Sequence, residues 1–244
     1  MLFSDVLPPH LIFSELPGCE CHGSCNDPLR CACLARSGGL NYIPDTRFLR
    51  QSSFIKDRAI YECNSSCSCD NFKCTNRLVQ HLLEDSGPLQ EMKTSVGKGR
   101  GVSATRRIRT GEFVCIYRGL YIRPDEAEST CAKQAAAWSH VYVLVVREFA
   151  GEKMVFETVI DGACDGCERL PLSSLINHSC EPNLTVVPVR VDSLLPLLAF
   201  FARVDIEEDE EVAYDYGEQS GGHVSLKPCL CGSTKCRGFL PNHS

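Results

Sequence analysis

The sequence lacks a hydrophobic run long enough to cross a lipid bilayer. Its longest apolar stretch, residues 194–201, contains a proline and is well short of the roughly 20 residues that a membrane-spanning helix needs. The first residues also lack the basic start and the long apolar segment of a signal peptide. We therefore expect no membrane contact, and a location in a reducing compartment, the cytosol or the nucleus.

An excess of positive charge is also absent. The 25 lysine and arginine residues are outnumbered by 31 aspartate and glutamate residues, so the formal net charge is -6, and no extended basic tract occurs. This balance opposes nucleic-acid binding and suits a basic partner. We expect no sequence-specific contact with nucleic acid. The alternative, a zinc-based nucleic-acid binder, would show strongly salt-dependent DNA binding.

Cysteine, by contrast, is abundant. The 244 residues have an ordinary globular composition, with 43% hydrophobic and 23% charged residues, but they include 17 cysteines. In a reducing compartment, so many thiols predict metal sites rather than disulfides. A disulfide-rich secreted protein is the alternative, which the odd number of cysteines disfavours.

Nine of the cysteines form two groups between residues 18 and 80. The members are Cys19, Cys21, Cys25, Cys31 and Cys33, followed by Cys63, Cys67, Cys69 and Cys74. Tetrahedral four-thiolate sites cannot share nine thiolates without a remainder. Three zinc ions need twelve ligand positions, which six terminal and three bridging thiolates supply. Because the segment has few core-forming side chains, we predict closed structural sites whose metal binding supplies much of the folding free energy.

Three more cysteines, Cys229, Cys231 and Cys236, lie close together near the C-terminal end. They lack a fourth ligand for a tetrahedral zinc site. Cys164 and Cys167 have the spacing of a ligand pair, but two ligands do not make a site.

Two polar segments hold the side chains best suited to chemistry. Residues 177–183 read Asn-His-Ser-Cys-Glu-Pro-Asn, and residues 210–217 read Glu-Glu-Val-Ala-Tyr-Asp-Tyr-Gly. The second segment is a predicted strand, so Tyr214 and Tyr216 point to one face and Asp215 to the other. We predict that the two phenols form one wall of a pocket.

A glycine-rich segment and a series of strands complete the pattern. Glycines at 97, 99 and 101 permit positive φ and close backbone approach to a ligand, without the strand-then-helix context of a dinucleotide fingerprint. The other expected elements are an extended arm over 1–17, a loop over 35–61, a short strand at 76–80, a first small sheet over 92–122, a helix over 127–138, a hairpin of strands at 141–146 and 154–160, and strands at 184–187, 197–202 and 211–216.

These features, in this order from about residue 18 to 238, resemble the SET-domain protein lysine methyltransferases. Residues 157–161 and 188–193 are most similar to the SET portion of proteins in which a SET domain is fused to a mariner transposase. The resemblance implies a mainly β SET fold with short helices, in which the two polar segments cross as a pseudoknot. It also implies an N-terminal arm at 1–17, a pre-SET cluster of three zinc ions at 18–80, a SET domain at 92–217 with an insert at about 123–175, and a one-zinc post-SET site at 226–238.

The implied reaction is transfer of a methyl group from S-adenosylmethionine to a lysine of a histone tail, histone H3 in particular, within chromatin in the nucleus. Whether the target is lysine 9 or lysine 36 stays open. The implied catalytic residues are Tyr216, Tyr117 and Tyr214, and a tyrosine at 214 favours a mono- or dimethyl product. The implied cofactor-binding residues are Lys98, Gly99, Arg100, Gly101, Tyr142, Asn177 and His178. Cys180 is implied as the fourth ligand of the post-SET zinc.

This reaction requires no general-base carboxylate. A free lysine has a pKa of about 10.4, and its amine must lose a proton to become a nucleophile. An apolar channel beside a positive sulfonium disfavours the ammonium form by desolvation and by like charge. Holding donor and acceptor in line supplies much of the rate.

Four positions depart from the family pattern. Arg100 stands where tryptophan is common, Leu120 where glutamate is usual, and Ser174 and Leu175 replace an arginine and a phenylalanine. These departures predict weaker cofactor binding or compensation by residues of the insert. They also support an alternative function, a catalytically weak or inactive SET scaffold that binds histones or partner proteins. Such a scaffold would give no calorimetric signal with S-adenosylmethionine despite full zinc loading.

Overall fold

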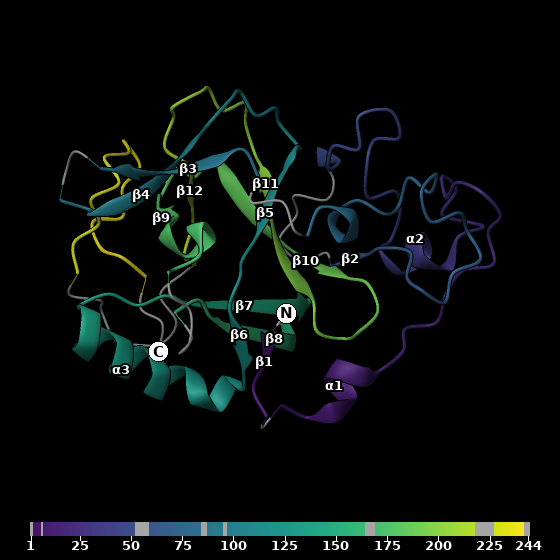
Figure 1. The fold of residues 1–244 in the computed structure, drawn as a ribbon, viewed down its shortest axis with the longest axis horizontal. Helices are drawn as coiled ribbons and strands as arrows, with labels where there is room; N and C mark the ends of the chain where they lie inside the picture. The colour runs from purple at the N-terminus through teal and green to yellow at the C-terminus, as the bar shows by residue number, and fades with distance from the viewer. Residues whose placement is uncertain are drawn as a thin grey trace.

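The computed structural model describes residues 2–5, 7–51, 59–83, 87–94, 97–163, 169–217 and 227–241. Within them strands predominate, in two four-stranded sheets and two strand pairs, with short helices between (Figure 1). This arrangement confirms the predicted mainly β fold class. No helix in these ranges is long and apolar enough to span a membrane.

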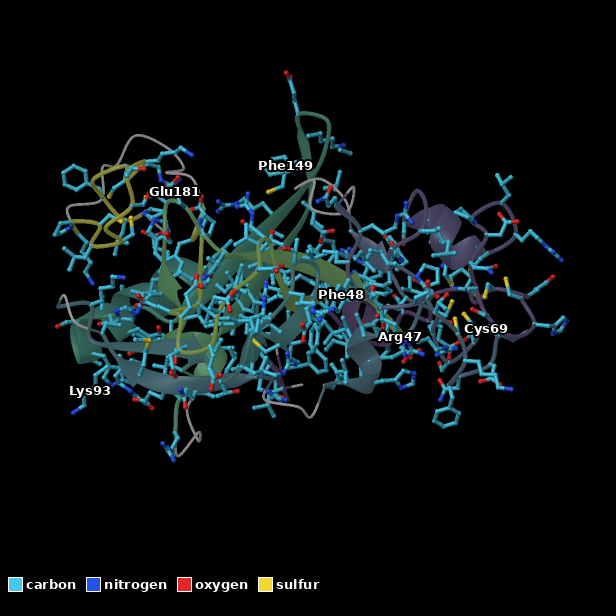
Figure 2. All side chains as sticks on the ribbon, turned by 90° about the horizontal axis from the view of Figure 1, so that it is seen from above. Arg47, Phe48, Cys69, Lys93, Phe149 and Glu181 are labelled. Atoms are coloured by element: carbon cyan, nitrogen blue, oxygen red, sulfur yellow. The ribbon has the colours of Figure 1, made fainter. Side chains whose placement is uncertain are left out.

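The first sheet has the strand order β1-β6-β8-β7 and contains the predicted hairpin. Its strands are β1 Leu2–Phe3, β6 Leu120–Ile122, β8 Lys153–Asp161 and β7 Val143–Ala150. The hairpin of β7 and β8 turns at Gly151, whose φ is +64°, and its tip projects from the body beyond Phe149 in Figure 2. Within the predicted extended arm, β1 pairs with β6, whereas α1 (Pro9–Phe13) is helical rather than extended.

The second sheet has the order β2-β10-β11-β5 and lies at the centre of the core. Its strands are β2 Ile60–Tyr61, β10 Leu184–Arg190, β11 Leu197–Ala202 and β5 Phe113–Ile116. Every residue of β11 is buried. Because side chains alternate along a strand, Phe200 enters one hydrophobic cluster and Phe201 a second. The cluster around Phe200 also contains Tyr117 and Tyr214, so it joins the core to the residues predicted to be catalytic.

Two strand pairs carry the sequence motifs. β9 (Asn177–His178) runs parallel to β12 (Ala213–Tyr214), so the two polar segments meet as the pseudoknot requires, although the strand predicted over 211–216 is reduced to β12. β3 (Leu89–Lys93) pairs with β4 (Arg100–Ala104), and the glycine-rich segment lies between them. The single small sheet predicted over 92–122 is wrong, because β4, β5 and β6 belong to three different sheets.

One helical turn replaces a predicted strand. Residues Val79–His81 form the 3-10 turn η2 rather than part of a strand over 76–80. The buried carboxylate of Glu62 accepts hydrogen bonds from the backbone N–H groups of Leu78 and Val79, both at 2.8 Å. Acceptors at this position stabilise the start of a helical turn. The carboxylate lies 16 residues away in sequence, so local periodicity could not reveal it.

The remaining helices are short, except for the predicted insert helix. That helix, α3, spans Ala127–Trp138, follows the 3-10 turn η3 (Pro124–Glu126), and ends at Ser139 in the left-handed conformation. The others are α2 (Ala32–Arg36) and the 3-10 turn η4 (Leu172–Leu175). Within the predicted loop over 35–61, the described residues include the end of α2, the bridge between Tyr42 and Leu49, and the strand β2.

Candidate active site and metal centres

The crossing of the two polar segments is held by one carboxylate. Asn177 donates through Nδ2 to Glu211 Oε1 at 2.9 Å and to the carbonyl of Arg100 at 3.2 Å. The other oxygen of Glu211 accepts from Lys98 Nζ at 2.9 Å. The glycine-rich loop and the Asn-His turn, predicted to bind the same cofactor, are therefore joined through Glu211. Sequence reasoning did not assign Glu211 a role, because a second acid in a Glu-Glu pair has no distinctive local signal.

The glycine loop fits close approach of a ligand. A Cβ at Gly101 would lie 2.7 Å from the Thr94 side chain and 2.9 Å from Asn177 Nδ2, so a side chain there would displace the amide. Gly99 has a φ of +84°, and a Cβ there would meet nothing within 4 Å, so this loop borders open space. These features fit a bulky cofactor such as S-adenosylmethionine lying against the loop.

His178 and Asp215 connect the crossing to the C-terminal cysteine region. The buried His178 ring accepts at Nδ1 from the backbone N–H of Tyr216 at 3.2 Å, while its Nε2 is 3.3 Å from Cys180 Sγ. Asp215 accepts from the guanidinium of Arg237 at 2.6 Å, and its carboxylate lies 3.8 Å from His178 Nδ1. The turn that would hold the cofactor therefore contacts the C-terminal cysteine region directly.

Three tyrosines predicted to be catalytic converge on this crossing. The ring centroids of Tyr214 and Tyr216 lie 4.7 Å apart. The ring of Phe200 lies between Tyr214 and Tyr117, with centroid distances of 5.0 Å to Tyr214 and 6.4 Å to Tyr117. The Tyr216 hydroxyl donates to the carbonyl of Ile176 at 2.9 Å. Burial raises the pKa of all three phenols above the ordinary tyrosine value, so they stay protonated and can donate hydrogen bonds.

Two of the four departures from the family pattern lie beside these groups. Ser174 donates to the carbonyl of Gly162 at 3.0 Å, and a Cβ at Gly162 would lie 2.4 Å from the Ser174 hydroxyl and 2.6 Å from that of Tyr117. Arg100 turns its guanidinium to Glu91 on β3, with hydrogen bonds of 2.6 and 2.9 Å. Of Arg100, only the backbone carbonyl contacts Asn177.

The other two departures serve packing. Leu175 is buried in the same hydrophobic cluster as Tyr117, and Leu120 packs beside a smaller cluster around Ile122. Tyr142, predicted to contact cofactor, is half-buried, and its ring lies 4.6 Å from that of His140 at an interplanar angle of 47°.

The nine pre-SET cysteines form one cluster, which is also the core of their segment. Their sulfurs form four overlapping groups in which all Sγ atoms lie within 4.8 Å of one another. Individual Sγ–Sγ distances include 3.7 Å for Cys19–Cys25 and 3.6 Å for Cys33–Cys67. Tetrahedral zinc with Zn–S bonds of about 2.3 Å places its thiolates about 3.8 Å apart, so the spacing fits zinc. Each described cysteine is a free thiol, which opposes the disulfide alternative.

The C-terminal cysteines form a second, separate group. Cys180, Cys229, Cys231 and Cys236 all lie within 4.8 Å of one another through their sulfurs. This is the long-range contact implied for a post-SET zinc. Glu181 fixes the same region, because it accepts from Ser233 and pairs with Lys235, and those two contacts lower the pKa of its exposed carboxyl to about 2.

Figure 2 places the two cysteine groups at opposite ends of the molecule, marked by Cys69 and Glu181. Cys164 and Cys167, which have the spacing of a ligand pair, lie outside the described residues.

Fold and site together define a SET domain that follows a pre-SET motif. The family model for the SET domain matches residues 99–217, and that for the Pre-SET motif matches residues 4–77. Histone-lysine N-methyltransferase SETMAR of Bos taurus is 35% identical over 258 residues, covering 99% of this chain and 78% of the relative. Su(var)3-9 of Drosophila melanogaster, also a histone-lysine N-methyltransferase, is 37% identical over 91% of this chain and 35% of its own length.

Solved structures agree with this assignment. The methyltransferase domain of human SETMAR superposes with a TM-score of 0.77 at 33% identity, covering 99% of this chain and 86% of that domain chain. KRYPTONITE, solved with mCHH DNA, an H3(1–15) peptide and SAH, gives a TM-score of 0.70 at 28% identity, covering 98% of this chain and 46% of its own. The chain belongs to the SET-domain histone-lysine N-methyltransferases, and its predicted enzyme class, an S-adenosylmethionine-dependent methyltransferase, is confirmed.

Proposed function

We propose that this enzyme methylates a lysine in the tail of histone H3 and forms mainly mono- and dimethyl-lysine. The observation that carries the proposal is the convergence of Tyr216, Tyr214 and Tyr117 beside the Asn177–Glu211 contact. The H3 peptide in the KRYPTONITE complex and the net charge of -6 support a basic tail as substrate. Nucleosomal chromatin in the nucleus is the corresponding location.

The proposed catalytic residues act by shaping an apolar channel for the lysine side chain. The Tyr214 ring, packed on the buried ring of Phe200, would line it, and an apolar lining disfavours the charged ammonium form of the incoming lysine. The Tyr216 and Tyr117 hydroxyls are fixed by backbone carbonyls and stay protonated, so they orient the neutral amine through hydrogen bonds rather than remove its proton. Such positioning supplies much of the rate in an in-line displacement.

The proposed cofactor site lies on the other side of the phenols. When bound, S-adenosylmethionine supplies the electrophilic methyl group. Lys98, Gly99 and Gly101 would border its amino-acid part, and Asn177 with His178 its adenosyl part, with Tyr142 as a further wall. For Arg100 we propose a contact through the backbone alone, because its guanidinium is held by Glu91.

Metal ions are proposed as structural elements. We assign three zinc ions to the nine pre-SET cysteines and one to Cys180 with the C-terminal trio, because thiolates alone line each group. The proposed modules are the pre-SET cluster at 18–80, the SET domain at 92–217 with its insert, and the post-SET site at 226–238.

The test is transfer of radiolabelled methyl groups to core histones, followed by recombinant H3 and H4 separately. We expect label on H3 and about a 10²-fold loss of kcat in Tyr216→Phe, because one oriented hydroxyl is lost at the reacting centre. Tyr61→Phe, which alters a tyrosine remote from the phenol cluster, should keep normal kcat.

Label on H4 in place of H3 would reject histone H3 as the substrate. If the protein is fully loaded with zinc but transfers no methyl group and gives no calorimetric signal with S-adenosylmethionine, it is the inactive scaffold.

A further inference from the structure

One buried polar side chain of the insert helix reaches towards the proposed lysine channel. Gln134 of α3 is only 5% exposed, whereas most of that helix faces solvent. Both ends of its amide are used: Oε1 accepts from the backbone N–H of Tyr142 at 2.7 Å, and Nε2 donates to Asp161 Oδ1 at 2.6 Å. Asp161 is fixed in turn, because the same oxygen accepts from the N–H of Ala163 at 2.8 Å.

The residue that Gln134 holds is the acceptor for a channel tyrosine. The carbonyl of Tyr142 accepts from the hydroxyl of Tyr117 at 2.7 Å and from the N–H of Gly162 at 2.9 Å. Hydrogen bonds therefore fix both polar groups of the Tyr142 backbone. Gln134 binds the N–H group, and Tyr117 and Gly162 bind the carbonyl.

Little room is left for this arrangement to shift. A Cβ at Gly162 would lie 2.6 Å from the Tyr117 hydroxyl and 2.9 Å from the Tyr142 carbonyl. Packing at this density transmits displacement of one group to its neighbours rather than absorbing it. Loss of the Gln134 amide would leave the Tyr142 N–H buried without this acceptor, and the segment at 142 would have to move to satisfy it.

We propose that Gln134 is a positioning residue, which sets the direction of the Tyr117 hydroxyl by holding the backbone of Tyr142. The inference rests on the proposed role of Tyr117 in orienting the lysine amine. Through Gln134, the insert helix would contribute to the reaction, although it carries none of the sequence motifs.

The test is a double-mutant cycle with methyl transfer to H3 as the assay. Gln134→Met, which keeps length and helix preference but removes both hydrogen bonds, should lower kcat about tenfold, the size expected when a reacting group is displaced by a fraction of an ångström. Because Tyr142 is also a proposed wall of the cofactor site, kcat is measured at saturating S-adenosylmethionine, so that a change in cofactor affinity does not enter the comparison. In a Tyr117→Phe background, the same substitution should change kcat by less than about twofold, because the hydroxyl that it acts on is gone.

Matched variants keep the result interpretable. Lys133→Leu alters the exposed neighbour on the same helix and should leave kcat normal. Gln134→Asn, one methylene shorter, carries the same test if Gln134→Met does not fold, as judged by its melting transition. Additive losses in the double mutant would overturn the inference while leaving the role of Tyr117 intact. Full activity of Tyr117→Phe itself would instead remove the role of Tyr117, and the inference with it.

Discussion

Cys180 and Cys229 lie 3.9 Å apart through their sulfurs, although 49 residues separate them in the sequence. The backbone N–H of Arg237 also points at Cys180 Sγ at 3.3 Å, and the Arg237 guanidinium reaches Asp215. Since Cys180 is two residues from His178, the proposed post-SET metal site and the proposed cofactor turn share one short segment. Metal loading at the C-terminal end should therefore affect cofactor binding.

Substitution of Cys180 tests this coupling. Cys180→Ser should reduce bound zinc from four ions to three per chain, because a tetrahedral thiolate site loses one ligand. Affinity for S-adenosylmethionine should fall at least about tenfold, since the turn at His178 loses its anchor. Elemental analysis and calorimetry measure the two quantities.

The matched control is a cysteine outside the groups. Cys131 belongs to none of the thiol groups that could hold a metal, so Cys131→Ser should retain all zinc. Equal zinc content in Cys180→Ser and the unmodified protein would contradict the proposed post-SET site.

Glu211 should be as important for cofactor binding as the residues of the two motifs. Glu211→Ala removes the partner of Lys98 and an acceptor of the Asn177 amide. Each partly buried hydrogen bond contributes about 1 kcal/mol, so we expect roughly a tenfold loss of S-adenosylmethionine affinity by calorimetry. Glu208→Ala, in the exposed acidic turn, should bind normally. Unaltered affinity in Glu211→Ala would show that the carboxylate only supports the fold.

Product specificity should depend on the Tyr214 hydroxyl. This side chain is buried and packs its ring against Tyr216, so removal of its hydroxyl in Tyr214→Phe enlarges the proposed channel where further methyl groups would lie. We expect the variant to gain trimethyl-lysine relative to the unmodified enzyme, as read from the mass spectrum of an H3 peptide. A mainly trimethylated product from the unmodified enzyme, or no gain in the variant, would refute this assignment.

Alkaline titration should distinguish the buried phenols from ordinary ones. Burial raises the pKa of five of the seven tyrosines, which are Tyr42, Tyr117, Tyr121, Tyr214 and Tyr216. Above the unfolded tyrosine pKa of about 10, the folded chain therefore holds more protons than the unfolded chain, and its stability should fall as pH rises further. Ultraviolet absorbance should show fewer tyrosinates in the native protein than in urea at the same pH. Identical titration curves in both states would show that the phenols are solvated.

Several parts of the site could be predicted from residue order alone. Nine clustered cysteines and a later trio predicted metal groups, and the spacing of Tyr214 and Tyr216 predicted that the two phenols lie together. The alternating and apolar strands at 184–187 and 197–202 were placed correctly as well. These signals are local, because the spacing of residues within one segment determines which face each side chain takes.

Other parts depended on contacts between distant segments. The helical turn at 79–81 forms because a carboxylate at 62 accepts from its first N–H groups, against the strand prediction. The Arg100 guanidinium is paired with Glu91, an interaction that the pairing of β3 with β4 creates. Periodicity in either segment carries no information about such partners.

The sequence by itself determined the family, the mainly β fold and the clustering of nine N-terminal and three C-terminal cysteines, since each depends on residue types at fixed local spacing. Only the tertiary structure decided that Glu211 joins Lys98 to Asn177 and that Gln134 holds the acceptor of the Tyr117 hydroxyl. The physical reason is that hydrogen bonds of this kind require two side chains within about 3 Å. Folding brings such side chains together by crossing segments that lie tens of residues apart.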